Sequence, residues 1–216
     1  MPRTSFAFRS LKHSIGILLM PLVLIGCATV APPSAPDPVP TREQAASRAY
    51  HDTIAIGGRL SVRYQQNARD EIIHGSFTWT QRADTTLVTL FSPLGQTIAV
   101  IEITPTLSTL TQAGQAPRTA TNVDALVAGT LGWPLPVSGL QDWLQGFSVD
   151  AQGRRFIASP APEASSVTTR DGWRLNYPIW QDDPGQSRPR RVDLERSTAQ
   201  AGDVAIRIVI DAWQPG

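Results

Sequence analysis

The chain has 216 residues, with 19 basic and 18 acidic side chains, three histidines and one cysteine. A formal charge of +1 excludes an electrostatic binder of nucleic acid, which needs a large basic excess. The only lysine is Lys12, which excludes a catalytic Schiff-base lysine or a phosphate-loop lysine in the rest of the chain.

Residues 1–26 are typical of an export signal. Three basic residues, Arg3, Arg9 and Lys12, precede an apolar run from Ile15 to Ile25. That run is shorter than the roughly 20 residues needed to span a bilayer. Without those three residues the basic count falls from 19 to 16 against 18 acidic residues, which gives −2.

The small Gly26 stands directly before Cys27, the only cysteine. This arrangement resembles a bacterial lipoprotein signal, in which the cysteine becomes lipid-modified after cleavage. We therefore predict lipidation at Cys27, which would leave no thiol for a disulfide, for catalysis or for a metal. Ala28, where lipoproteins of the inner membrane often carry Asp, implies the outer membrane, at its periplasmic face. The alternative is an ordinary secretory signal with an incidental cysteine.

Residues 27–45 are predicted to be a lipidated cysteine followed by a proline-rich, semi-rigid linker. Arg42 to Asp52 has a polar composition compatible with a short helix. Residues 46–216 contain no second linker of this kind, so they are predicted to form a single domain of ordinary size.

From Ile56 onward apolar and polar residues alternate, as in strands with one buried face. The clearest run comes last, where Val204, Ile206, Ile208 and Ile210 share a face opposite Arg207 and Asp211. The predicted strands lie near 56–64, 75–79, 87–91, 97–104, 107–111, 154–159, 167–170, 173–179, 191–196 and 204–213. Polar breaks at 65–70, 82–85, 112–116, 160–166 and 182–190 separate them. Many short strands favour a mainly β domain whose antiparallel sheet curls into a barrel or sandwich. Gly57 and Gly58 favour a bulge at its edge.

One interruption is helical. Asn122 suits the N-cap of a helix that ends at Gly132, and a second short helix ends at Gly146. Between them, Trp133-Pro134-Leu135-Pro136 is forced to be extended by its prolines. These helices either complete the core or form a lid over a cavity, and periodicity alone favours the core.

Three ordered motifs resemble the LolB family of outer-membrane lipoprotein receptors. They are Leu90-Phe91-Ser92-Pro93-Leu94-Gly95-Gln96, Gly132-Trp133-Pro134-Leu135-Pro136 and Leu140-Gln141-Asp142-Trp143-Leu144-Gln145-Gly146. The match in order spans about 56–213, and Ser92 departs from the Asn that the family often carries. The resemblance implies an unclosed antiparallel β-barrel with a short-helix lid over an apolar cavity. It also implies a receptor that takes triacylated lipoproteins from the periplasmic carrier LolA and inserts them into the outer membrane.

The resemblance makes Pro93, Leu94 and Gly95 a membrane-insertion loop, with Leu94 protruding. The turn chemistry agrees, because Pro93 and Gly95 suit the second and fourth places of a tight turn. The alternative is that Leu94 folds back onto the sheet. Candidate acyl-chain cavity and lid residues, each of which would serve equally in a dry core, are Phe77, Trp79, Phe91, Ile101, Trp133, Leu140, Trp143 and Leu144.

We expect no enzyme, no cofactor, no metal and no nucleic acid, and a monomer whose partners are LolA, lipoprotein acyl chains and the outer membrane. The sequence contains no G-x-S-x-G or H-E-x-x-H motif, and His51 and His74 lack metal-ligand spacing. The competing function is a structural lipoprotein of an envelope assembly without lipid transfer. That protein would show a filled interior and an exposed sheet edge.

Overall fold

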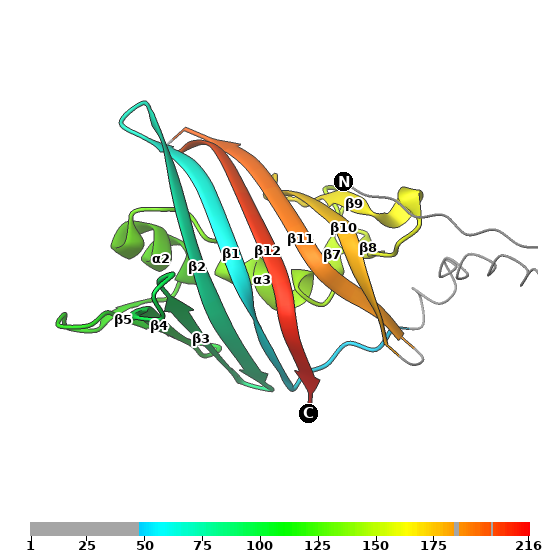
Figure 1. Ribbon diagram of the computed structural model, residues 1–216, viewed down its shortest axis with the longest axis horizontal. Coiled ribbons are helices and arrows are strands. Elements are labelled where there is room, and N and C mark those ends of the chain that lie inside the picture. Colours follow the sequence, from blue (N-terminus) through cyan, green and yellow to red (C-terminus); the bar gives the residue numbers. More distant parts are fainter. Residues whose placement is uncertain (1–47, 184–185, 200) are drawn as a thin grey trace, which may run out of the picture. The chain divides into compact units, whose positions relative to one another are not determined.

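Ten strands form one antiparallel sheet in the computed structural model, which describes residues 48–183, 186–199 and 201–216. The spatial order is β6-β5-β4-β3-β2-β1-β12-β11-β10-β9 (Figure 1). The strands are β1 (Ile54–Gln66), β2 (Arg69–Arg82), β3 (Thr85–Phe91), β4 (Thr97–Ile103), β5 (Ser108–Thr111), β6 (Arg118–Ala120), β9 (Ser166–Thr168), β10 (Arg174–Asp183), β11 (Gln186–Thr198) and β12 (Gly202–Pro215). The predicted export signal, Cys27 and most of the linker lie outside the described residues.

The alternation in the sequence sets which face of each strand is buried. On β1 the residues Leu60, Val62 and Tyr64 are buried, and on β12 the residues Val204 and Ile206 are buried. Their neighbours along each strand point to the other face, because successive side chains alternate across a strand. The sheet therefore has one apolar face that carries the core and one face rich in charged residues.

A bulge interrupts the pairing of β1 with β12 between Gly57 and Gly58. The glycine pair predicts a bulge at the edge of the sheet, but these two strands are central. A Cβ atom at Gly58 would lie 2.1 Å from the carbonyl oxygen of Val209. Only glycine permits this close approach of the two backbones. The bulge adds local twist to the central strands of the sheet.

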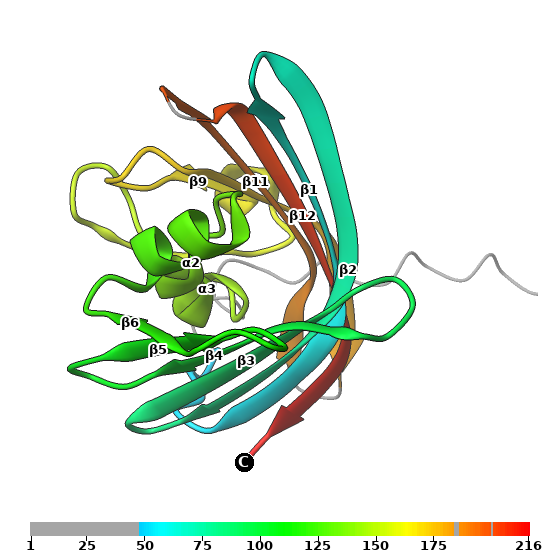
Figure 2. The ribbon, with the colours of Figure 1, turned by 90° about the vertical axis from the view of Figure 1, so that its left-hand side faces the viewer.

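The sheet does not close on itself. Its two edge strands, β6 and β9, have three residues each and do not pair with one another. Figure 2 shows the sheet curving around the helical insertion without the two edges meeting. The predicted mainly β, unclosed antiparallel fold is confirmed.

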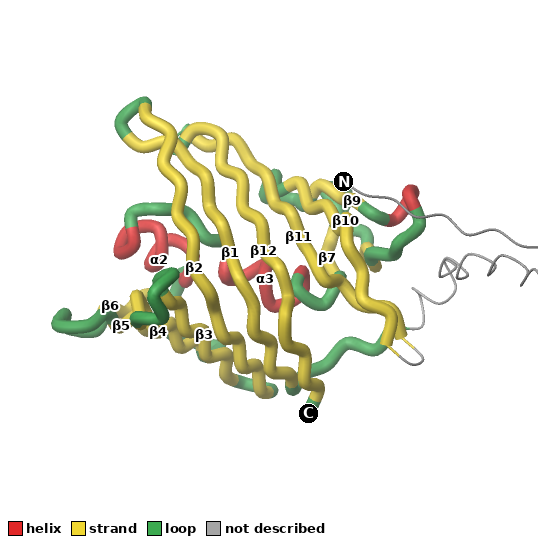
Figure 3. The backbone as a smooth tube through the Cα atoms, in the orientation of Figure 1, coloured by secondary structure: helices red, strands yellow, loops and turns green. Residues whose placement is uncertain are grey.

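The chain between β6 and β9 carries two short helices. They are α2 (Val123–Leu131) and α3 (Val137–Trp143), and they lie on the concave side of the sheet (Figures 2 and 3). A small hairpin follows, β7 (Phe147–Val149) with β8 (Arg155–Ile157), and then a single 3₁₀ turn, η1 (Pro162–Ala164). No helix among the described residues is long and apolar enough to cross a membrane.

Three details of the predicted elements are wrong. Residues 48–52 of the expected helix Arg42 to Asp52 are not helical, and residues 42–47 lie outside the described part. The predicted break at 182–190 is mostly strand, because β10 runs to Asp183 and β11 begins at Gln186. The three-residue strands β6 and β7 were not expected, since so short a run has no readable alternation.

The described residues belong to one compact unit. Its core is continuous, from the inner face of the sheet to the buried residues of α2 and α3. Because the core draws on the sheet and the helices of this unit alone, we treat it as a unit that folds by itself.

Candidate functional site

A small apolar cavity lies between the concave face of the sheet and the helical insertion. The sheet side and the helical side both contribute only apolar side chains. The lining residues are Leu60, Phe77, Trp79, Val88, Leu90 and Ile208 from the sheet, and Leu135, Leu140 and Leu144 from the insertion. The open space is about 20 Å³, which is room for about one water molecule.

This cavity is therefore closed in the described conformation. Leu135, Leu140 and Leu144 fill the space that a longer apolar guest would need, and each is buried. A guest larger than one water molecule can enter only if the segment carrying these leucines moves away from the sheet. We call residues 123–146, which contain α2, α3 and Leu144, the lid.

One cavity residue, Trp79, carries a polar N–H group, and this group is hydrogen-bonded. Trp79 Nε1 donates to Gln81 Oε1 at 3.4 Å, and Gln81 Nε2 donates to the hydroxyl of Tyr50 at 2.9 Å. Burial raises the pKa of Tyr50, so this hydroxyl stays protonated over the physiological range. The chain of contacts lets a large aromatic side chain line an apolar space without an orphaned N–H group.

The two lid helices are joined by one carboxylate. Asn122 caps α2 by accepting from the backbone N–H of Ala125 at 2.9 Å, and Gly132 ends it at a φ of +81°. Asp124, in the first turn of α2, accepts from the backbone N–H of Ser138 at 2.9 Å and from its hydroxyl at 2.6 Å. This contact therefore holds α3 against α2 in the closed conformation.

The C-terminal end of the lid is fixed by the segment before β1. The side-chain amide of Gln145 accepts from His51 N at 2.9 Å and donates to His51 O at 3.1 Å. The guanidinium of Arg48 donates to the carbonyl oxygen of Gln145 at 3.3 Å. Tyr177 donates from its hydroxyl to Trp143 O at 3.2 Å. These contacts make the end of the lid near residue 145 its fixed end.

Arg48 is a buried cation, and its guanidinium also donates to Ala158 O at 2.6 Å and Ser187 O at 3.0 Å. The ring of Trp180 lies 5.0 Å from it. Burial lowers the pKa of this guanidinium to about 10. Carbonyl dipoles and an aromatic face, rather than a carboxylate, offset the desolvation of this charge among the described residues.

The loop between β3 and β4 projects beyond the sheet (Figure 2). Gly95 N donates to Ser92 O at 2.9 Å, and Ser92 N donates to Gln96 O at 2.8 Å. Gly95 has a φ of +79°, a conformation that glycine adopts without strain. Leu94 sits in this tight turn with 87% of its surface exposed, so it does not fold back onto the sheet.

Four of the eight residues predicted for the cavity line it. Phe77, Trp79, Leu140 and Leu144 do so. Ile101, Trp133 and Trp143 are buried in the surrounding core instead. Trp143 packs against Trp173, with the ring centroids 6.5 Å apart.

The prediction for Phe91 is wrong. On β3 the buried residues are Val88 and Leu90, and Phe91 is only half buried on the opposite face. Both faces of this strand carry apolar residues, so alternation alone did not fix the inner face. The cavity residues that were missed are Leu60, Val88, Leu90, Leu135 and Ile208.

The described residues hold no group of three or more histidine, cysteine, aspartate or glutamate side chains that could bind a metal.

Comparison with known proteins agrees with this architecture. Residues 52–213 match the sequence profile of the family described as "Outer membrane lipoprotein LolB". The chain belongs to the LolB family. It is 37% identical to the outer-membrane lipoprotein LolB of Cupriavidus taiwanensis, over 96% of this chain and 99% of that protein. The LolB of Cupriavidus pinatubonensis is 39% identical, over 94% of this chain and 95% of its own length.

Among solved structures, a LolA superfamily protein from Nitrosomonas europaea aligns with 81% of this chain and 91% of its own. The TM-score is 0.44 and the identity is 10%. The LolB assignment rests on the sequence match, which covers the sheet, the lid and the loop carrying Leu94.

Proposed function

We propose that this chain is an outer-membrane receptor for lipoproteins, which holds their acyl chains between the lid and the concave face of the sheet. The observation that carries the proposal is the cavity between the sheet and the lid, whose two walls are apolar throughout. Membership of the LolB family, whose relatives are named outer-membrane lipoproteins, supports it.

Entry of an acyl chain requires the lid to open. Each methylene that leaves water contributes about 0.8 kcal/mol, so a long chain can displace Leu135 and Leu140 from the sheet. The displaced leucines lose part of their own burial, which reduces the net affinity. A receptor of this kind binds the chain more tightly than the donor does, yet releases it to a bilayer.

The direction of opening follows from the contacts at the two ends of the lid. The end near Gln145 is held by Arg48 and by the backbone of His51. The segment from Trp133 to Pro136 precedes α3, and among the described residues its backbone hydrogen bonds run to α3 itself. We infer that α3 swings about its C-terminal end, which moves Leu135 and Leu140 farthest.

The proposed setting is the periplasmic face of the outer membrane. Acylation of Cys27, with a second and third chain, would hold the protein there, since one chain alone binds only marginally. Leu94, at the tip of the Ser92–Gly95 turn, would enter the bilayer and lead the cargo into it. The periplasmic carrier LolA is the proposed donor, and the receptor would act as a monomer without chemical catalysis.

The small open volume favours a second candidate, an interaction lipoprotein whose interior stays filled. The unpaired edges β6 and β9 would then be its docking sites. The two candidates differ in whether the lid ever opens.

The test mixes the chain from Ala28 onward with LolA loaded with a triacylated lipoprotein, and measures how much cargo moves. Uptake by the wild-type chain supports the receptor. Leu94→Glu is expected to keep uptake but lose delivery to vesicles. Leu107→Glu is the matched control, because Leu107 is also exposed, at 44%, in a different turn.

No uptake by a folded wild-type chain would sink the receptor and favour the interaction lipoprotein. Equal delivery by Leu94→Glu and Leu107→Glu would keep the receptor and reject the insertion loop.

A further inference from the structure

The convex face of the sheet carries a groove at the base of the Ser92–Gly95 turn. Its open volume is about 560 Å³. The lining residues come from β1, β2, β12 and the turn itself, and they are Arg59, Leu60, Ser61, His74, Gly75, Ser76, Ser92, Pro93, Gly95, Arg207 and Val209. Leu94 is not among them, although it belongs to the same turn.

Strand register explains how this groove forms. Arg207 on β12 stands opposite Ser61 on β1, which stands opposite His74 on β2. In the neighbouring row, Arg59 stands opposite Ser76, which stands opposite Phe91, the last residue before the turn. The turn therefore rises beside two rows that contain both arginines.

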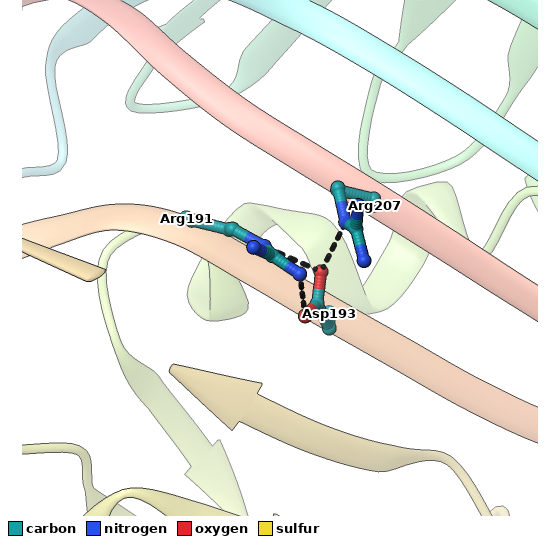
Figure 4. Close-up of polar contacts among 3 residues, drawn as sticks. All are labelled: Arg191, Asp193 and Arg207. Carbon is teal, nitrogen blue, oxygen red and sulfur yellow. Dashed lines mark hydrogen bonds and ion pairs between the residues drawn. The ribbon is translucent and has the colours of Figure 1, made fainter. Parts of the chain in front are cut away.

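The groove has one positive charge that its neighbours do not neutralise. Asp193 accepts from Arg191 Nε at 3.0 Å and from Arg191 Nη2 at 2.6 Å, and the same carboxylate accepts from Arg207 Nε at 3.2 Å. Figure 4 shows this carboxylate between the two guanidinium groups. One carboxylate is thus paired with two guanidinium groups, which leaves a net positive charge on this trio.

Arg207 is the member of this trio that reaches the groove. Asp193 and Arg191 are 20% and 23% exposed, whereas Arg207 is 59% exposed and lines the groove. Among the described residues Arg207 makes only the hydrogen bond through Nε. Its terminal nitrogens remain available for a phosphate, which arginine binds in a planar, two-pronged manner.

Arg59 is better neutralised. It donates to Asp211 through Nε at 2.8 Å and through a terminal nitrogen at 3.0 Å. The local excess of charge is therefore centred on Arg207.

Exposed apolar side chains stand beside this charge. Leu94 is 87% exposed at the turn, and Ile72, two residues before His74 on the same face of β2, is 58% exposed. Exposed apolar residues next to uncompensated positive charge are typical of a surface that binds a membrane. The apolar side chains enter the edge of the bilayer, and the positive charge contacts the lipid headgroups.

We propose that this groove binds the phosphate of an anionic lipid headgroup through Arg207, and so sets the depth and orientation at which Leu94 enters the membrane. The proposal rests on the insertion role proposed for Leu94. It assigns the convex face at the turn to the bilayer and leaves the lid side of the molecule open to cargo.

The test uses the chain from Ala28 onward, which contains the compact unit and lacks Cys27. Its binding is measured to vesicles of phosphatidylcholine alone and of phosphatidylcholine with phosphatidylglycerol. Binding to the anionic vesicles is expected to be tighter and to weaken as salt rises. Arg207→Gln is expected to lower that affinity about fivefold, the effect of one cation at a membrane surface.

Arg174→Gln is the matched control. It removes the same charge from the convex face, but Arg174 is paired with Glu195 and lines a different groove. We expect little change in its affinity for anionic vesicles. Equal losses in the two variants would show an effect of net charge alone and would overturn the proposal.

Asp193→Asn tests the same site through an expected rise, rather than a fall, in affinity for anionic vesicles. Removing the shared carboxylate leaves both guanidiniums uncompensated, so affinity for anionic vesicles is expected to rise while affinity for neutral vesicles stays the same. Misfolding would expose apolar surface and raise binding to both kinds of vesicle, so a rise confined to anionic vesicles is independent of folding defects. A fall or no change, with the wild-type melting temperature retained, would overturn the proposal.

Inorganic phosphate distinguishes a lipid headgroup from a free anion. At matched ionic strength, phosphate in place of chloride is expected not to release the protein from anionic vesicles. Release by phosphate through Arg207 would overturn the assignment to lipid.

Cargo uptake by the wild-type chain is measured separately. Uptake without any effect of Arg207→Gln on vesicle binding would keep the receptor and reject the headgroup site. An Arg207 effect without uptake would reject the receptor and keep the headgroup site.

Discussion

Arg48 donates a hydrogen bond to the carbonyl oxygen of Ala158 at 2.6 Å, across 110 positions of the sequence. The same guanidinium reaches Gln145 at the end of the lid and Ser187 at the start of β11. One cation thus holds together the lid, the loop after β8 and the β10–β11 hairpin. It also lies immediately after the segment predicted to lead to the membrane anchor.

Replacing Arg48 by methionine is expected to destabilise the domain. Two buried carbonyl groups and a partly buried one lose their donor, and each unsatisfied group costs about 1–3 kcal/mol unless water replaces it. Denaturant unfolding should show a loss of several kcal/mol. Arg154→Met is the control, because Arg154 forms an exposed ion pair with Asp150 and should change stability by less than about 1 kcal/mol. Similar losses in the two variants would contradict the role of Arg48.

Gly58→Ala is expected to destabilise the sheet at the bulge. Its Cβ atom would lie 2.1 Å from Val209 O, so β1 and β12 must separate. A loss of more than about 2 kcal/mol is expected in denaturant unfolding. Gly129→Ala is the matched control, since nothing lies within 4 Å of its Cβ position in α2. That change should stabilise by about 0.5–1 kcal/mol, and a loss there would contradict the geometry.

Asp124→Asn is expected to loosen the lid. The charged acceptor that joins α2 to Ser138 becomes neutral, and a weaker closed state makes the open one more populated. A loss of about 1 kcal/mol in the closed state should raise the apparent affinity for an apolar fluorescent probe up to about fivefold. Ser138→Ala, which removes one of the two contacts, should show a smaller rise. Unchanged affinity in both would contradict a lid that limits binding.

Asp211 should make stability depend on pH in the acid range. The hydrogen bond from Arg59 holds the pKa of Asp211 below its usual value. The contribution is therefore complete above the unfolded pKa of about 3.9 and is lost as the pH falls through the lower folded pKa. Unfolding measured against pH should show a shallower acid slope in Asp211→Asn and in Arg59→Gln. An unchanged slope in both variants would contradict this pairing.

Much of the fold could be predicted, because alternation is a local signal. The inner faces of β1 and β12 follow from residues such as Leu60 and Ile206, and the bounds of α2 follow from Asn122 and Gly132. The bounds of the long hairpin β10–β11 could not be predicted from alternation. Its polar residues are held in strands by pairing, such as Gln181 with Arg188, rather than by an apolar face.

The site could be predicted only in part. Phe77 and Trp79 lie on a face that alternation makes clear, whereas Leu90 and Phe91 compete for the inner face of β3. The structural role of Arg48 could not be predicted. It stands in a polar run that is typical of a solvent-exposed helix, and the residues that accept its hydrogen bonds lie 97 to 139 positions away in the sequence. The excess positive charge at Arg207 depends on the register of the strands, which could not be predicted from the sequence.

In the proposed receptor an acyl chain replaces the lid leucines against the concave face, beside Trp79. The most direct measurement is quenching of tryptophan fluorescence by a triacylated lipopeptide with brominated chains, in the wild-type chain, Trp79→Phe and Trp173→Phe. Trp79 lines the cavity, and Trp173 is equally buried but does not. We predict strong quenching that Trp79→Phe largely removes and Trp173→Phe preserves. Quenching that is absent in the wild-type chain, or equal in the two variants, would contradict the account.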